Sequence, residues 1–188
     1  MRAPTVQFKR HRKNITNYKT RLKLLLSLKP RLVVRPSLKG IVVQLTQYNS
    51  KGDDVKVTVN GQSLRKLGWP YNTGNLPAAY ICGLLAGAKA KKAGISEAIL
   101  DMGGVYSVKG SRVYAVVKGC KEAGLQVPCG EEVLPSEERV TGKHIEGYGS
   151  SDSGKSKYQF STYKTNVSEM SETVRSMKDK ITKEMTNG

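Results

Sequence analysis

The sequence predicts an α/β fold whose mixed sheet includes a three-stranded antiparallel meander, in the order helix, three strands, helix, strand, helix. A basic N-terminal arm precedes this core and a C-terminal helical extension follows it. Two observations predict the core: short segments rich in β-branched residues lie between turn formers, and longer segments carry apolar residues at helical spacing. A third observation predicts the arm, because the first 52 residues contain thirteen lysines and arginines and no acidic residue.

Length and composition divide the chain of 188 residues into one domain with extensions. Residues 1–28 are the basic arm and first helix. Residues 29–130 are the α/β core. Residues 131–165 are an extension and flexible linker, and residues 166–186 are a C-terminal amphipathic helix.

The arm begins with residues 1–14, which contain few apolar side chains and are expected to be extended and disordered until bound. A helix follows, with Thr16 or Asn17 as its cap. Its apolar residues recur at i, i+4, i+7 and i+8 and are Tyr18, Leu22, Leu25 and Leu26. We expect this stripe to pack on the core and the lysines and Arg21 to face a polyanion.

Three strands are predicted next, over residues 31–35, 40–48 and 55–59, with a hairpin loop at 49–53. Alternation places four polar residues on polar faces of the meander: Gln44, Thr46, Lys56 and Thr58. These side chains are either available to sugar and phosphate or simply solvated.

A long helix is predicted from a cap at Thr73 or Asn75 to about Ala93, and its small residues Gly83 and Gly87 permit close packing against neighbouring elements. A strand over residues 97–101 and a second helix over residues 111–123 complete the core. The second helix turns Val113, Val116, Val117 and Cys120 inward, and we interpret Cys82 and Cys120 as small core hydrophobes.

The last helix has a cap at Asn166 and a continuous apolar stripe formed by Val167, Met170, Val174, Met177, Ile181 and Met185. The helix either packs on the core or docks on RNA or a neighbouring protein, and we expect the core.

The distribution of charge along the chain indicates the class of partner that it binds. The net charge is +17, and the first 52 residues supply +13 of it. Cations placed on phosphates release condensed counterions, so such an arm favours a polyanion. We therefore interpret the chain as an RNA-binding protein. A transit peptide is disfavoured because the basic pattern runs directly into core strands. A membrane-surface helix is disfavoured because the helix is short and ends at Lys29 and Pro30.

One motif invites an enzymatic interpretation. Residues 149–156 read GSSDSGKS and match the phosphate-binding pattern GxxxxGKS. A working loop follows a buried strand and opens a helix, whereas residues 142–148 are polar and glycine-rich and residues 158–163 look extended or irregular. We interpret the segment as a flexible linker.

Other catalytic patterns are incomplete. A nuclease needs several carboxylates on one face, but the first two strands contain none and Asp101 stands alone. His11 and His144 lack a nucleophile and an orienting partner.

Three cysteines without CxxC spacing indicate a reducing compartment. We expect no enzyme, no metal site, no cofactor and no membrane association.

Several motifs together carry a family resemblance. They are KPRLVVRPS at residues 29–37, TGNLPAAY at 73–80, GLLAG at 83–87, LDMG at 100–103, KEAGL at 121–125 and VTGKHI at 140–145. The chain resembles, over residues 8–148, the large-subunit ribosomal protein family that binds 5S rRNA. The segment after residue 125 is similar to the archaeal and eukaryotic branch, because the bacterial branch stops soon after the Ala-Gly-Leu segment.

The resemblance implies a structural constituent of the large subunit of cytoplasmic ribosomes that binds 5S rRNA and helps attach it to 23S rRNA in the central protuberance. Implied partners are 5S rRNA, 23S rRNA and neighbouring large-subunit proteins, including another 5S rRNA-binding protein. The implied RNA-binding residues are Lys9, Arg10, Arg12, Lys13, Asn14, Thr16, Tyr18, Arg21, Lys23, Arg31, Arg35, Ser37, Lys39, Gln44, Thr73, Gly74 and Asn75.

Two details stay open. Many members read Asn-Lys-His after the position of Ser37, whereas Leu38, Lys39 and Gly40 stand here, so only Lys39 keeps a clear physical role. Tyr18 either stacks on or hydrogen-bonds to RNA, or packs through the helix stripe.

The leading alternative function is a free RNA-binding or assembly factor, followed distantly by a P-loop nucleotidase.

Overall fold

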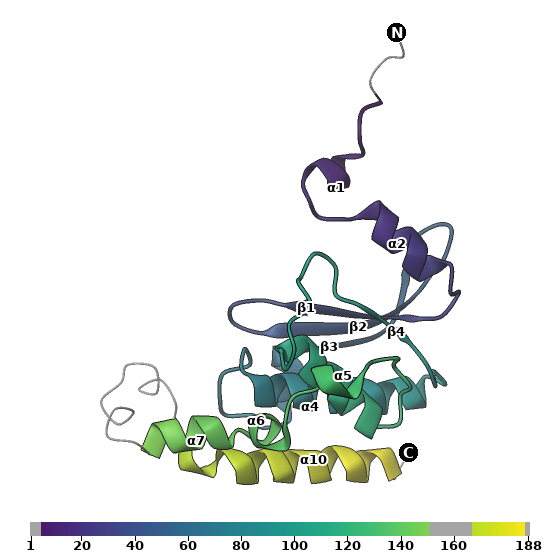
Figure 1. Cartoon of the computed structure of the whole chain (residues 1–188). Coiled ribbons are helices and arrows are strands. Elements are labelled where there is room, and N and C mark those ends of the chain that lie inside the picture. Colours follow the sequence, from purple (N-terminus) through teal and green to yellow (C-terminus); the bar gives the residue numbers. More distant parts are fainter. Residues whose placement is uncertain (1–4, 151–166, 187–188) are drawn as a thin grey trace.

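The computed structural model describes residues 5–150 and 167–186 (Figure 1). Its elements are α1 (Lys9–Arg12), α2 (Tyr18–Leu25), β1 (Arg31–Pro36), β2 (Ile41–Gln47), β3 (Asp54–Asn60), α3 (Gly61–Lys66), α4 (Leu76–Lys92), β4 (Ile99–Asp101), α5 (Arg112–Glu122), η1 (Glu131–Val133), α6 (Glu137–Thr141), α7 (Lys143–Ser150), η2 (Val167–Glu169) and α10 (Met170–Thr186). The sheet lies between the arm on one side and α4 and α5 on the other. Helices α6, α7 and α10 form the layer farthest from the arm (Figure 1).

The sheet has the strand order β3-β2-β1-β4. Strands β1, β2 and β3 pair antiparallel and β4 pairs parallel to β1, which confirms the predicted meander and the mixed sheet. Val33 lies opposite both Gln44 on β2 and Asp101 on β4. The register places β1 and the end of β4 side by side, so polar groups from the two strands meet on the sheet face below the arm.

Helix α4 confirms the predicted boundaries. The side chain of Asn75 accepts a hydrogen bond from the backbone N–H of Ala78, and Gly94 ends the helix with a φ of +71°. The predicted close packing is also present: a Cβ on Gly83 would collide with the backbone of Val116 on α5. The two helices can pack at this distance because Gly83 has no side chain.

The inward residues predicted on α5 are all buried, and so are Cys82 and Cys120. The C-terminal helix α10 packs on α4, which confirms docking on the core. The buried stripe comprises Val167 of η2 and Met170, Val174, Met177 and Ile181 of α10. The side chain of Met185, also predicted in the stripe, lies outside the described ones. The stripe extends the hydrophobic core by a third layer beneath α4.

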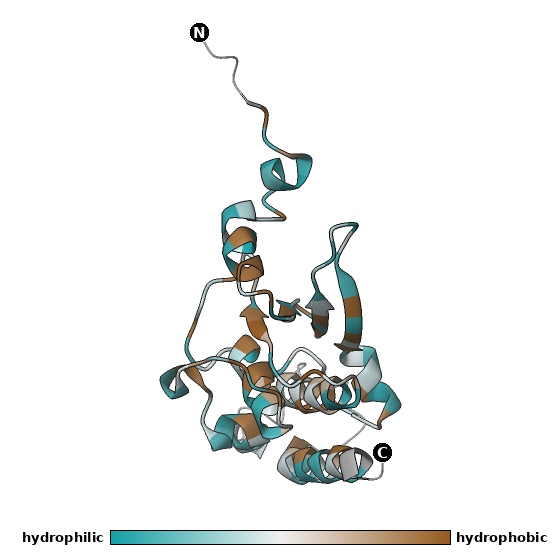
Figure 2. Cartoon of the chain, turned by 90° about the vertical axis from the view of Figure 1, so that its right-hand side faces the viewer, coloured by the Kyte–Doolittle hydropathy of each residue, from teal (hydrophilic) through white to brown (hydrophobic). Residues whose placement is uncertain are grey.

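One orientation was predicted wrongly. Helix α2 buries none of its residues, and Leu22 and Leu26, two members of its predicted core stripe, are exposed. In Figure 2 the brown, hydrophobic residues of α2 lie outside the packed layers. The helix instead turns Arg21 toward the sheet, because Asp53, in the turn just before β3, supplies an ion-pair partner.

Other differences are local. Residues 9–12 form a helical turn where an extended chain was expected, and Thr46 lies on the predicted polar face but is buried. Helices α3, α6 and α7 were not anticipated. The phosphate-loop-like motif at residues 149–156 begins at the end of α7, and its part from residue 151 onward lies outside the described residues, as does the cap predicted at Asn166. Within the described ranges, no helix has the length and apolar character needed to cross a membrane.

Candidate nucleic-acid interface

The arm has a compact fold of its own. A left-handed residue, Asn14 with φ +54°, turns the chain between α1 and α2. The carbonyl of Arg10 accepts hydrogen bonds from the N–H groups of Ile15 and Thr16, and Arg10 Nε donates to Thr16 Oγ1 over 3.0 Å. The side chain of Asn17 then caps α2 by accepting from the N–H groups of Lys19 and Thr20, which confirms Asn17 as the cap. The two short helices therefore carry their cations in a fixed relation to each other.

Tyr18 packs within the arm and not in the core. Its ring lies 5.4 Å from that of Phe8 and 6.3 Å from that of His11, centroid to centroid, and Tyr18 is 36% exposed. The aromatic contact joins the start of α1 to the start of α2. Phe8 itself is 73% exposed and remains available to a partner.

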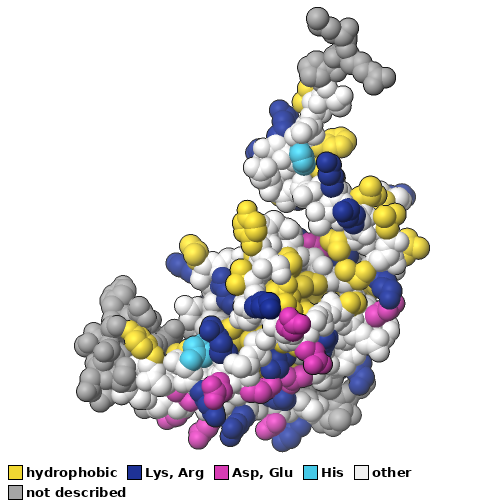
Figure 3. Space-filling model, in the orientation of Figure 1, with side chains coloured by type: hydrophobic (Ala, Val, Ile, Leu, Met, Phe, Trp, Pro, Cys, Tyr) yellow, Lys and Arg dark blue, Asp and Glu magenta, His cyan; other side chains and the backbone are white. Residues whose placement is uncertain are grey.

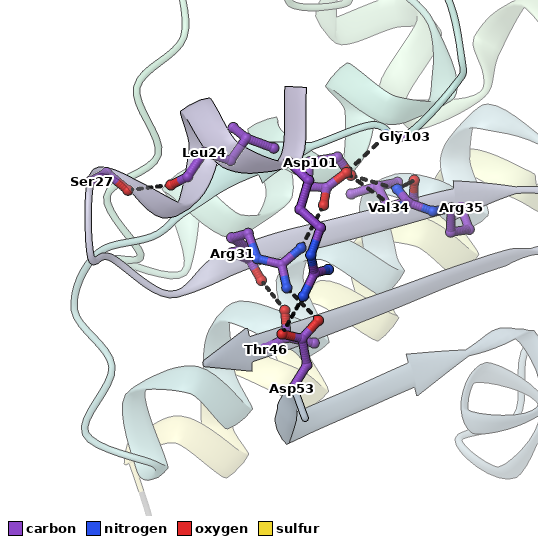
Figure 4. Close-up of polar contacts among 10 residues, drawn as sticks. Leu24, Ser27, Arg31, Val34, Arg35, Thr46, Asp53, Asp101 and Gly103 are labelled. Carbon is purple, nitrogen blue, oxygen red and sulfur yellow. Dashed lines mark hydrogen bonds and ion pairs between the residues drawn. The ribbon is translucent and has the colours of Figure 1, made fainter. Parts of the chain in front are cut away.

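The arm is attached to the sheet by a chain of alternating charges (Figure 4). Arg21 Nη2 of α2 lies 2.8 Å from Asp53 Oδ1, and Arg31 Nη2 of β1 lies 2.5 Å from Asp53 Oδ2. Arg31 Nη1 also lies 2.8 Å from Asp101 Oδ2, and Arg35 Nη2 lies 3.0 Å from Asp101 Oδ1. We call Arg21, Asp53, Arg31, Asp101 and Arg35 the ion chain. It joins α2, the β2–β3 hairpin, β1 and β4.

The charge states within the ion chain follow from their contacts. Partial burial acts to raise the pKa of Asp53, but the hydrogen bonds and charges of Arg21 and Arg31 outweigh it and hold the pKa below its ordinary value. The hydrogen bond to Asp53 likewise raises the pKa of Arg21. Both groups therefore keep their charges throughout the physiological range of pH.

Arg31 lies deepest in the ion chain. It is 3% exposed, and its guanidinium contacts two carboxylates while its carbonyl oxygen accepts from Thr46 Oγ1. A cation in this position is neutralised by the protein itself. Arg31 thus links Asp53 to Asp101 inside the ion chain, whereas the side chain of Arg35 remains 43% exposed.

The other predicted arm cations are exposed. They are Lys9, Arg10, Arg12, Lys13 and Lys23, and Lys19 joins them. Figure 3 shows dark blue side chains spaced along the arm, whereas magenta carboxylates gather on the opposite end of the molecule around α6, α7 and α10. The acid-free segment thus projects from the body, on the side away from most of the acidic side chains.

The β1–β2 turn is held rigidly against the start of α4. Thr73 Oγ1 donates to the carbonyl of Lys39 over 2.8 Å, and Arg112 Nη1 donates to the carbonyls of Ser37 and Gly74. Thr73 is buried, and the backbone N–H of Gly74 donates to Asn72 Oδ1. The turn at residues 73–75, which the resemblance implied as an RNA contact, therefore makes largely internal hydrogen bonds. These bonds leave Ser37 and Lys39 exposed on a fixed turn.

Sequence reasoning missed several residues of this surface. Arg112 organises the turn, and its position just after Ser111 at the start of a helix was the available signal. Leu38 is 97% exposed on the turn and Tyr106 is 89% exposed on the β4–α5 loop. Exposed apolar tips beside cations suit contact with unpaired bases.

A groove separates the arm from the outer face of the sheet. Its volume is about 310 Å³, and it runs beneath α2 with the ion chain along its floor. Gln44 lines it from β2, and Arg10 and Thr16 line it from the arm. The predicted residues of α2, β1 and β2 therefore meet around one cavity. Within the described part of the chain, no group of three or more His, Cys, Asp or Glu side chains could hold a metal ion.

Comparison with known proteins identifies the family of the chain. Residues 3–97 match the family model described as ribosomal large subunit proteins 60S L5 and 50S L18. The chain is 47% identical over 160 residues to the large ribosomal subunit protein uL18 of Korarchaeum cryptofilum, covering 84% of this chain and 82% of that protein. It is 43% identical over 182 residues to uL18 of Methanococcus maripaludis, covering 94% of each.

These relatives are structural proteins of the ribosome and not enzymes, in agreement with the expectation from the sequence. Both come from archaeal species, as the segment after residue 125 suggested. An exposed cationic arm, held on an α/β core by the ion chain, is consistent with that role. This chain belongs to the L18 family of large-subunit ribosomal proteins and is a structural constituent of the large ribosomal subunit.

Proposed function

We propose that this protein binds 5S rRNA through its N-terminal arm and helps to attach it to 23S rRNA in the central protuberance of the large subunit. One observation carries the proposal: the cations of α1 and α2 are exposed and project from the body, while the ion pair between Arg21 and Asp53 fixes the arm's root to the sheet. A charged surface attached in this way can recognise the shape of a folded RNA as well as its charge.

The structure divides the implied RNA-binding residues by accessibility. We assign direct phosphate contacts to the exposed arm cations and to Arg35 and Lys39. We assign no phosphate contact to Arg31 or Thr73, since both are buried and Arg31 is already paired with two carboxylates. Neighbouring large-subunit proteins, including another 5S rRNA-binding protein, would then contact the faces that the arm leaves free.

The affinity for 5S rRNA tests whether the arm binds this RNA. The affinity is measured over a range of salt concentrations, with a control RNA of equal length, for the double variant Arg12→Ala and Lys13→Ala. The matched control is Arg175→Ala with Lys180→Ala, which removes the same two charges from the exposed face of α10. Loss of two phosphate contacts reduces the salt slope by about 1.4 to 1.8, since each contact contributes roughly 0.7 to 0.9.

We expect the arm variant to weaken 5S rRNA binding at least tenfold and the α10 variant to leave it unchanged. Equal binding to both RNAs, or equal losses for the two variants, would contradict the proposal. Attachment to 23S rRNA is tested separately by depleting the protein from cells and measuring 5S rRNA in purified large-subunit particles. Particles that keep their full complement of 5S rRNA would contradict the attachment role.

A further inference from the structure

The groove beneath α2 has two unlike sets of walls. Its apolar walls are Ile15 and Leu24 from the arm and Val33 and Val55 from the sheet. These side chains come from both sides of the cavity, so a flat group inserted between them would contact aliphatic carbon on each face. A volume of about 310 Å³ lies at the low end of small-molecule pockets, which span roughly 300 to 1,000 Å³. The groove is therefore sized for one small planar group with its substituent and not for a helix.

The remaining lining of the groove contains both hydrogen-bond donors and hydrogen-bond acceptors. Four arginines and two aspartates line it, a net charge of +2, and they are Arg10, Arg21, Arg31, Arg35, Asp53 and Asp101. Gln44 adds an amide, whose Nε2 has one long hydrogen bond of 3.4 Å to Thr58. Among the described residues, Arg31 Nε is a buried side-chain donor with no hydrogen-bond partner, and it belongs to the floor of this groove. A buried donor of this kind favours a ligand that brings an acceptor oxygen against it.

We propose that this groove binds a single unpaired RNA nucleotide, whose base enters between α2 and the outer face of the sheet. The inference rests on the proposed function in that the RNA is taken to be the one held by the arm. The base lies between the aliphatic side chains of the arm and those of the sheet. Its carbonyl oxygen accepts from the Arg31 and Gln44 donors, and the phosphate of the same nucleotide lies outward near Arg10. Proteins commonly read unpaired RNA bases by burying their faces and bonding their edges.

The groove fits a nucleotide better than a bare phosphate. Asp53 and Asp101 line the cavity and would repel an anion placed deep inside it. The same carboxylates can accept hydrogen bonds from the N–H groups of a base. The four aliphatic side chains offer nothing to a phosphate but do contact a base. Net positive charge and apolar walls together therefore match a nucleotide.

Titration of the labelled protein with uridine 5′-monophosphate tests the site directly. The readout is the NMR signals of the Arg31 Nε–H and the Gln44 side-chain amide, with inorganic phosphate as the second probe. The variant Val33→Phe fills the groove from β1. The matched control is Val42→Phe, since Val42 is 38% exposed on the neighbouring strand β2 and does not line the groove. Gln44→Ala removes a polar partner without adding bulk.

We expect uridine 5′-monophosphate to shift both signals saturably and inorganic phosphate to leave them in place. Val33→Phe should weaken nucleotide binding at least tenfold and Gln44→Ala at least threefold, whereas Val42→Phe should bind as the unaltered protein does. Equal shifts with phosphate would reduce the groove to an anion site and overturn the proposal. Absence of saturable shifts at millimolar nucleotide, or unchanged binding by Val33→Phe, would overturn it as well.

Base-specific chemical probing of bound 5S rRNA places the site in the complex. Val33→Phe should expose one unpaired base that the unaltered protein and Val42→Phe protect, with a smaller loss of overall affinity than the arm variants cause. Identical protection with Val33→Phe would overturn the assignment. Because the mononucleotide titration uses no 5S rRNA, failure of the groove and failure of 5S rRNA binding are seen separately.

Discussion

Arg21 and Asp53 form the ion pair that joins the arm to the core, with 2.8 Å between Nη2 of the arginine and Oδ1 of the aspartate. The two residues come from different structural units, a helix that buries no residue of its own and the hairpin between β2 and β3. Asp53 is shared with Arg31, so one carboxylate both holds the arm and supplies one of the two ion pairs of a buried cation.

Replacing Asp53 with Ala should therefore destabilise the fold and release the arm. Arg31 would retain Asp101 as its partner but lose one of its two ion pairs, and we expect the free energy of unfolding to fall by about 1–3 kcal/mol. Urea denaturation measures that change, and limited proteolysis after Arg12 or Lys13 reports release of the arm. The neighbouring Asp54→Ala is the control: its side chain is 53% exposed, and its loss should cost less than about 0.5 kcal/mol. Equal effects of the two substitutions would contradict the ion chain's role.

The same carboxylate predicts a dependence of stability on acid. Its pKa in the folded protein lies below the ordinary value of 3.8, so its contribution is complete above that value and disappears as the pH falls through the lower, folded-state pKa. The stability difference between the unaltered protein and Asp53→Asn should be constant from pH 7 to 5 and should shrink below pH 4. Urea denaturation of both proteins over this range measures it. A difference that does not change with acid would show that the charge of Asp53 is unimportant.

Helix packing gives a third prediction. Gly83→Ala would place a Cβ against the backbone of Val116, and a backbone cannot move aside as a flexible side chain can. We expect α4 and α5 to be forced apart, at a cost of about 1–3 kcal/mol or more. The melting temperature, measured by thermal unfolding, reports this loss of stability. Gly104→Ala is the matched control, because a Cβ there meets nothing within 4 Å, and its melting temperature should stay close to that of the unaltered protein.

Thiol reactivity gives a fourth prediction. Burial raises the pKa of Cys82 and of Cys120 to about 12, and it raises the pKa of the half-buried Cys129 as well. At pH 8 the native protein should react with an aromatic disulfide reagent at Cys129 alone, and the other two thiols should react only as the protein unfolds. Mass spectrometry of labelled peptides identifies the sites. Rapid labelling of Cys82 in the native protein would contradict the packing of α4.

Local signals predicted most of the core. β-Branched runs identified the strands and Asn75 and Gly94 marked the ends of α4, because these signals are read within one element. Helix α3 was missed because its capping box joins Asn60 to Ser63, where a glutamate or glutamine is the usual partner. The short helices α6 and α7 contain or border glycines, which propensity alone disfavours.

The sequence predicted a cationic arm before the sheet but not the orientation of its second helix, α2. The helical period of α2 identifies an apolar face, yet it cannot say that Arg21 will face inward, since Asp53 lies 32 residues away. The resemblance implied Arg31 only as an RNA-binding residue, and no local pattern in the sequence indicates that it is buried. Its burial depends on Asp101, 70 residues farther along the chain and brought beside it by the parallel pairing of β4. Contacts between residues so far apart follow only from the topology.

Helix α10 covers α4 although the two are separated by most of the chain's second half. The underside of α4 therefore stays in contact with water during translation until residues 170–181 have been made and have left the exit tunnel. Because that closing contact is so distant in sequence, it forms late and slows the completion of the core relative to the β1–β2–β3 meander. A newly made chain thus passes through a stage in which the meander is already folded and the opposite end still exposes a hydrophobic surface that can bind a chaperone.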